Sequence, residues 1–136
     1  MRLTDLEPQF FRVEFRTETW KRVKPGIDPL KGNWTDDDFE DFTGPREYHV
    51  PCEFAEAHGI QFICPLHKDT DGHGTLWAFR DRGVPAGTLS RNKDGVDTRW
   101  EVSGTGYGDL TMKPSLLVQA APSCEWHGFI TNGEVT

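Results

Sequence analysis

The chain has 136 residues, with fifteen Lys and Arg against twenty-two Asp and Glu, which gives a net charge of -7. Binding to a nucleic-acid backbone needs a concentrated positive patch, so this balance argues against DNA or RNA as a partner. The length suits one domain with an aromatic-rich core, and we expect residues 1–136 to form that single domain. No stretch approaches the about 20 apolar residues of a membrane span, and the first residues lack the layout of a secretory signal, so we expect a cytoplasmic protein.

The N-terminal part, residues 1–58, carries one clear strand signal. From Phe10 to Arg16, apolar and charged side chains alternate as in a half-buried strand. Residues 24–45 are rich in Pro, Gly and Asp and are predicted to be loop, with one short helix that Thr35 caps and that continues through Phe42.

Residues 52–58 are predicted to form a helical turn that Gly59 ends in the left-handed conformation. The strands predicted elsewhere in the chain are residues 48–50, 60–63, 76–79, 100–102 and 110–118.

The C-terminal part, residues 59–136, favours strands and tight turns. Pro114 interrupts a strand-like stretch and predicts an edge, a bulge or a break there. Asn132-Gly133 between apolar flanks predicts a closing β-hairpin. Together with the predicted turns, this pattern indicates a mainly β fold, a small antiparallel β domain with one or two short helices; an α+β fold is the alternative.

Two short clusters, Cys64-Pro65-Leu66-His67 and Cys124-Glu125-Trp126-His127, each place a thiol and an imidazole three positions apart. Two such pairs supply the four tetrahedral ligands of a structural zinc site. We therefore predict that Cys64, His67, Cys124 and His127 bind one Zn²⁺ ion, which would fasten the middle of the chain to its last hairpin. Two unrelated coincidences of spacing are the alternative, and Cys52 remains as the cysteine outside the site.

A further histidine, His73, follows the first cluster and leaves a second arrangement open. If His73 replaces His67, or if one of the four residues stays off the metal, three protein ligands and an activated water would remain. In that case Asp69, Asp71 or Glu125 is a candidate general base for a zinc-dependent hydrolase.

The sequence contains none of the local motifs that mark common catalytic sites. We find no His-Glu-x-x-His helix, no Gly-x-Ser-x-Gly elbow and no phosphate-binding loop. The sequence therefore leaves open whether the protein is an enzyme and favours a protein without catalytic activity.

Several short motifs follow one another from Gly59 to the C-terminus. They are Phe62 to His67, Gly72-His73, Trp100, Lys113-Pro114-Ser115-Leu116 and Cys124 to Gly133. In this order and spacing, which covers more than half of the chain, they resemble the DUF6527 group of uncharacterised bacteriophage and prophage proteins.

The resemblance implies a zinc-binding β domain in residues 59–136 and a variable N-terminal part in residues 1–58. It carries metal roles onto Cys64, Cys124 and His127, and onto His67 at a position where relatives often have a second cysteine. The resemblance implies a phage origin and no established activity. A closed zinc site with no catalytic set beside it, together with an acidic surface, leads us to expect an accessory protein that binds a host or phage protein, for instance to inhibit host defence. A zinc-dependent hydrolase and a minor virion component are the alternatives, and the oligomeric state stays open.

Overall fold

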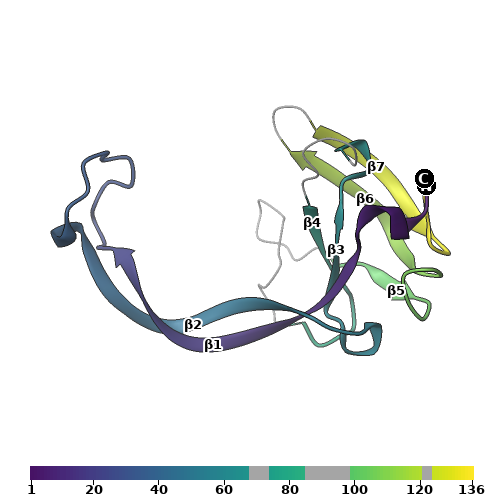
Figure 1. Ribbon diagram of the computed structural model, residues 1–136, viewed down its shortest axis with the longest axis horizontal. Helices are drawn as coiled ribbons and strands as arrows, with labels where there is room; N and C mark the ends of the chain where they lie inside the picture. Colours follow the sequence, from purple (N-terminus) through teal and green to yellow (C-terminus); the bar gives the residue numbers. More distant parts are fainter. Residues whose placement is uncertain (68–73, 85–98, 121–123) are drawn as a thin grey trace. The chain divides into compact units, whose positions relative to one another are not determined.

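The computed structural model describes residues 1–67, 74–84, 99–120 and 124–136, and strands dominate this part of the chain (Figure 1). The strands form two four-stranded sheets of order β2-β1-β3-β4 and β5-β6-β7-β8, with antiparallel pairing. The mainly β prediction is confirmed. The first sheet contains β1 (Gln9–Val23), β2 (Phe39–Pro51), β3 (Gly59–Ile63) and β4 (Gly74–Ala78), and the second contains β5 (Glu101–Ser103), β6 (Thr111–Ala120), β7 (Cys124–Thr131) and β8 (Glu134–Val135).

The helical elements of the described residues are single 3₁₀ turns rather than α-helices. They are η1 (Leu3–Leu6), η2 (Asp36–Asp38), η3 (Phe54–Glu56) and η4 (Pro65–His67). Within the same residues, no helix has the length and apolar character needed to cross a membrane.

The N-terminal part contains more strand than the sequence predicts. β1 continues to Val23, and β2, which begins at Phe39, takes up the last third of the predicted loop. The predicted helix from Thr35 through Phe42 is wrong, because η2 ends after one turn and Phe39 already has extended backbone angles. Contacts between the strands outweigh the local Pro, Gly and Asp content; the Arg22 guanidinium, for example, lies 4.1 Å from the centre of the Phe42 ring.

Gly59 also differs from its prediction, because it begins β3 instead of ending a helix. A Cβ atom at this position would collide with the backbone oxygen of Trp77 and the ring of Phe11. Glycine is therefore needed here for close packing.

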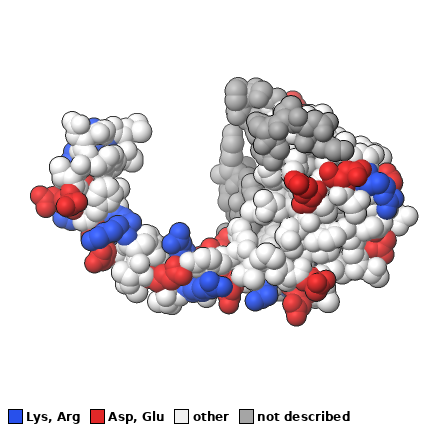
Figure 2. Space-filling view, viewed as in Figure 1, with Lys and Arg blue, Asp and Glu red and all other residues white. Residues whose placement is uncertain are grey.

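The chain divides into two compact units, one of Met1–Val13 with His49–Thr136 and one of Glu14–Tyr48. The second unit has Lys, Arg, Asp and Glu side chains interspersed along its surface (Figure 2). In it, Lys31 Nζ donates to both carboxylate oxygens of Asp38, at 2.7 and 2.8 Å, and this contact lowers the pKa of Asp38 below its usual range. The expected single domain stays a prediction.

The core of the first unit joins both sheets. Residues from β3 and β4 pack in one buried cluster with residues from β6 and β7, and Leu3 and Leu6 of η1 belong to it. The N-terminus lies beside the closing hairpin, where the Leu3 N–H donates to the Gly133 carbonyl at 2.9 Å (Figure 1). The predicted hairpin is confirmed, with Asn132 and Gly133 both at positive φ between β7 and β8.

β6 has the irregularity that Pro114 predicts. Its register on β7 shifts between Met112 and Leu116, and the Lys113–Pro114 peptide bond is cis. The shift lies next to Ser115.

Candidate functional site

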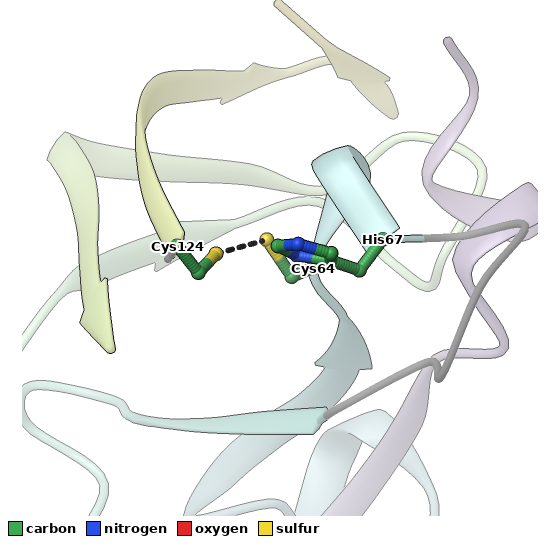
Figure 3. A group of neighbouring side chains, drawn as sticks. All are labelled: Cys64, His67 and Cys124. Carbon is green, nitrogen blue, oxygen red and sulfur yellow. Dashed lines mark hydrogen bonds between the residues drawn. The ribbon is translucent and has the colours of Figure 1, made fainter. Parts of the chain in front are cut away.

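Cys64, His67 and Cys124 meet in the first unit. Their ligand atoms all lie within 4.8 Å of one another, and both cysteines are buried (Figure 3). The two Sγ atoms are 3.4 Å apart. The structure thus brings together three of the four side chains predicted to bind zinc.

The turn after β3 explains how one segment supplies two of these side chains. Cys64 directly follows β3, and His67 is the last residue of η4. The backbone N–H of His67 donates to the Cys64 carbonyl at 3.0 Å. In a 3₁₀ turn, side chains three positions apart lie above one another. The spacing of Cys64 and His67 therefore places the thiol and the imidazole on the same side of the turn.

The distances suit a metal ion better than a disulfide. Two sulfurs bonded to one tetrahedral zinc at about 2.3 Å lie roughly 3.8 Å apart, whereas an S–S bond is about 2.05 Å. The observed Cys64–Cys124 separation of 3.4 Å is close to the first value. Thiolate and imidazole together form a donor set that favours zinc over hard cations.

His127 does not lie in this group. Along β7, buried and exposed residues alternate from Cys124 onward, so Cys124 faces the core and His127 faces solvent. Side chains three positions apart in a strand point to opposite faces. In the second Cys-x-x-His cluster, the thiol and the imidazole therefore lie on opposite faces of β7.

His127 instead contacts Ser115 on the neighbouring strand β6. Its Nε2 atom lies 2.8 Å from Ser115 Oγ, and the pair is reached from solvent because His127 is exposed and Ser115 is half-buried. Trp100 fixes the backbone of the serine, since its Nε1–H donates to the Ser115 carbonyl at 3.2 Å. A serine hydroxyl hydrogen-bonded to an imidazole is the basic unit of nucleophilic hydrolysis.

The same sheet face carries further side chains around this pair. Leu117 is the direct partner of His127 in the β6–β7 register, and the Phe129 ring lies 6.3 Å from the His127 ring with 28° between their planes. Glu125, predicted as a general base beside the metal, is exposed and shares the face of His127 two residues away.

The remaining candidates fall in two places. His73, Asp69 and Asp71 lie outside the described residues. Cys52 is half-buried, packs against the core, and has its pKa raised chiefly by burial.

The fold and these contacts define a small two-sheet β domain with a Cys/His group between its sheets and an exposed serine–histidine pair on one of them. The family whose model matches the chain, over residues 35–136, is BubE, the bacterial ubiquitination-like system serine protease. This match covers more than half of the chain, so the chain belongs to the BubE family. Comparisons with curated proteins and with solved structures give no match.

The family match overturns the resemblance to DUF6527 phage proteins, which is wrong. Order and spacing of short motifs were its only support, and no single motif is specific to one family. The phage origin depended on that resemblance and loses its support with it.

The sequence analysis missed the contact between Ser115 and His127, and Ser115 entered it only as one residue of a motif. Ser115 and His127 are twelve positions apart, and no local pattern links them. The one available signal was the alternation of apolar and polar residues from Cys124 to His127, which already predicts that His127 faces away from Cys124.

Proposed function

We propose that this protein is a serine protease in which Ser115 is the nucleophile and His127 the general base, acting on a protein component of a bacterial ubiquitination-like system. The 2.8 Å contact between Ser115 Oγ and His127 Nε2 carries the proposal. The family description supports it, because it names a serine protease of such a system. Of the serines that the structure describes, Ser103 and Ser115, it is Ser115 that contacts a histidine.

The chemistry follows from the two side chains. With its proton on Nδ1, neutral His127 accepts the Ser115 hydroxyl proton at Nε2 while Ser115 Oγ attacks the carbonyl carbon of the scissile bond. His127 then gives this proton to the leaving amine as the C–N bond breaks, and a water molecule hydrolyses the remaining ester with the same histidine as base. The exposed position of the pair suits a polypeptide substrate that lies over the sheet.

Substitution of Ser115 tests the proposal. We expect S115A to abolish cleavage of a mixed peptide library and the covalent labelling of the protein by a small fluorophosphonate, and H127A to slow both by about 10²- to 10⁴-fold through loss of the general base. The serine in β5 provides the matched control, S103A, which should behave as the parent protein.

Peptide mass spectrometry locates the labelled residue. A parent protein that reacts at a serine other than Ser115, or that does not react, would contradict the assignment. Equal thermal unfolding of S115A and parent establishes that the loss is chemical.

We further propose that Cys64, His67 and Cys124 bind a structural Zn²⁺ ion. The burial of the two cysteines, the distances among the three ligand atoms and the donor chemistry of the three side chains support this. The position of His127 on the other face of β7 argues against the four-residue set predicted from the sequence. Of the general bases predicted for the alternative zinc-dependent hydrolase, Glu125 lies on the face opposite Cys124, and Asp69 and Asp71 lie outside the described residues.

Metal analysis of purified protein tests this site. We expect about one zinc per chain in the parent and in C52S, and loss of zinc in C124S and H67A, because each of the latter removes one ligand. H127A should retain its zinc. Loss of zinc in H127A as well would restore the four-residue set predicted from the sequence. Retention of zinc in H67A would refute the three-residue set proposed here.

A further inference from the structure

Two large apolar side chains are exposed beside the Ser115–His127 pair. Leu117 on β6 is 47% exposed and Phe129 on β7 is 53% exposed. Both lie on the solvent face of the sheet, the face that also carries Ser115 and His127. Their exposure at this place needs a reason, because the next residues along both strands are buried.

The pairing of β6 with β7 fixes how the four side chains are arranged. Leu117 is opposite His127, and Leu116 is opposite Gly128. Ser115 and Phe129 therefore flank the Leu116–Gly128 pair on the side away from Leu117. The Ser115–His127 contact runs diagonally across this set, so Leu117 lies on one side of it and Phe129 on the other.

The backbone holds both apolar side chains outward. Phe129 exchanges two backbone hydrogen bonds with Thr136, at 3.1 and 3.0 Å. Leu117 lies between the buried Leu116 and Val118 of β6, whose side chains occupy the core side. Neither Leu117 nor Phe129 can turn inward without a shift of the strand register.

We infer that Leu117 and Phe129 bind apolar side chains of the substrate on the two sides of the scissile bond, an inference that rests on the proposed protease function. An extended polypeptide placed over β6 and β7, with its reacting carbonyl at Ser115 Oγ, would cover both residues. The substrate class is thus a polypeptide with an apolar residue next to the bond that is cleaved. An apolar substrate side chain that packs on Leu117 or Phe129 removes apolar surface from water, and this favours binding. A polar substrate side chain at the same place lacks this gain in binding free energy.

A peptide library with cleavage sites read by mass spectrometry tests this inference. We expect the parent protein to cut next to Leu, Ile, Val, Met or Phe about ten times more often than next to Asn, Ser or Asp. On a quenched peptide of the best sequence, L117S and F129S should each lower kcat/KM about ten-fold, mainly through a higher KM. L117I should recover most of this loss.

The control is L30S, which changes a leucine that is 89% exposed in the Glu14–Tyr48 unit. It should leave kcat/KM and the cleavage preference as in the parent. The rate of Ser115 labelling by a small fluorophosphonate should be equal in L117S, F129S, L30S and the parent, because the probe has no peptide side chains to place.

The outcomes separate the two proposals. Labelling of Ser115 together with no apolar preference, or with a preference that L117S and F129S leave unchanged, overturns this inference alone. Absence of labelling at Ser115 overturns the proposed function and this inference with it. A slower labelling of L117S or F129S would show that these residues support the pair itself and would also overturn the specificity role.

Discussion

His58 connects β1 to the segment before β3 through its imidazole and its backbone. The Nδ1 atom of His58 accepts a hydrogen bond from the Val13 N–H at 2.9 Å, and the backbone N–H of His58 donates to the Phe11 carbonyl at 2.9 Å. Burial lowers the pKa of His58, and the nearby cations Arg12 and Arg82 lower it further. Only the neutral imidazole can accept the Val13 hydrogen bond.

We expect the stability of the protein to decrease as the pH falls below about 6.5, partly through His58. The unfolded chain takes up this proton near its ordinary pKa, while the folded protein resists protonation to a lower pH, so acid favours unfolding across that window. Above about pH 6.5 the contribution is fully present. H58N keeps an acceptor for the Val13 N–H but does not titrate. Its free energy of unfolding should therefore decrease less than that of the parent protein when the pH is lowered.

Urea unfolding at pH 7.5 and at pH 5.5 provides the comparison. The difference in the free energy of unfolding between pH 7.5 and pH 5.5 should be smaller for H58N than for the parent protein. An equal difference in both proteins would mean that the Val13–His58 contact has no part in the acid response.

At the scale of elements, the Cys-x-x-His spacing occurs twice in the chain, once in a 3₁₀ turn and once in a strand. Cys64 and His67 flank a 3₁₀ turn and meet, whereas Cys124 and His127 are in a strand and point to opposite faces. A Cys-x-x-His pattern thus predicts a shared metal only after the local backbone is known.

Local signals predicted many of the strands and turns correctly. Asn132-Gly133 correctly predicted the closing hairpin, and Pro114 correctly predicted the irregularity in β6. Both features depend on the backbone preferences of the residues themselves. The length of β1 and β2 was missed, since pairing between distant residues overrides local composition.

The candidate site shows the same division. Cys64, His67 and Cys124 were available from the sequence by their chemistry. The Ser115–His127 contact was not, because it depends on the shifted register of β6 on β7, and a change of one residue in that register would move Ser115 to another face.

At the scale of the whole molecule, the Cys/His group connects the two sheets of the first unit. Cys64 follows β3 of one sheet, and Cys124 begins β7 of the other. A metal ion bound there would add to the apolar contacts of the core. The serine–histidine pair, in contrast, is held within one sheet by the β6–β7 ladder.

Metal removal is therefore expected to affect stability and catalysis differently. At a free zinc concentration of about 1,000 times the dissociation constant, binding contributes about 4 kcal/mol of stability, so a chelator should lower Tm by roughly 10–15 °C for a chain of this size. C124S, which lacks a ligand, should melt at the lower temperature with or without the chelator.

At 25 °C, well below melting, the chelated parent should still be labelled at Ser115 by the fluorophosphonate at close to its full rate, because neither Ser115 nor His127 belongs to the metal group. Loss of labelling and of peptide cleavage in the chelated but folded protein, with recovery on adding zinc, would favour a zinc-dependent hydrolase. An unchanged Tm in the presence of the chelator would mean that the three side chains hold no structural metal.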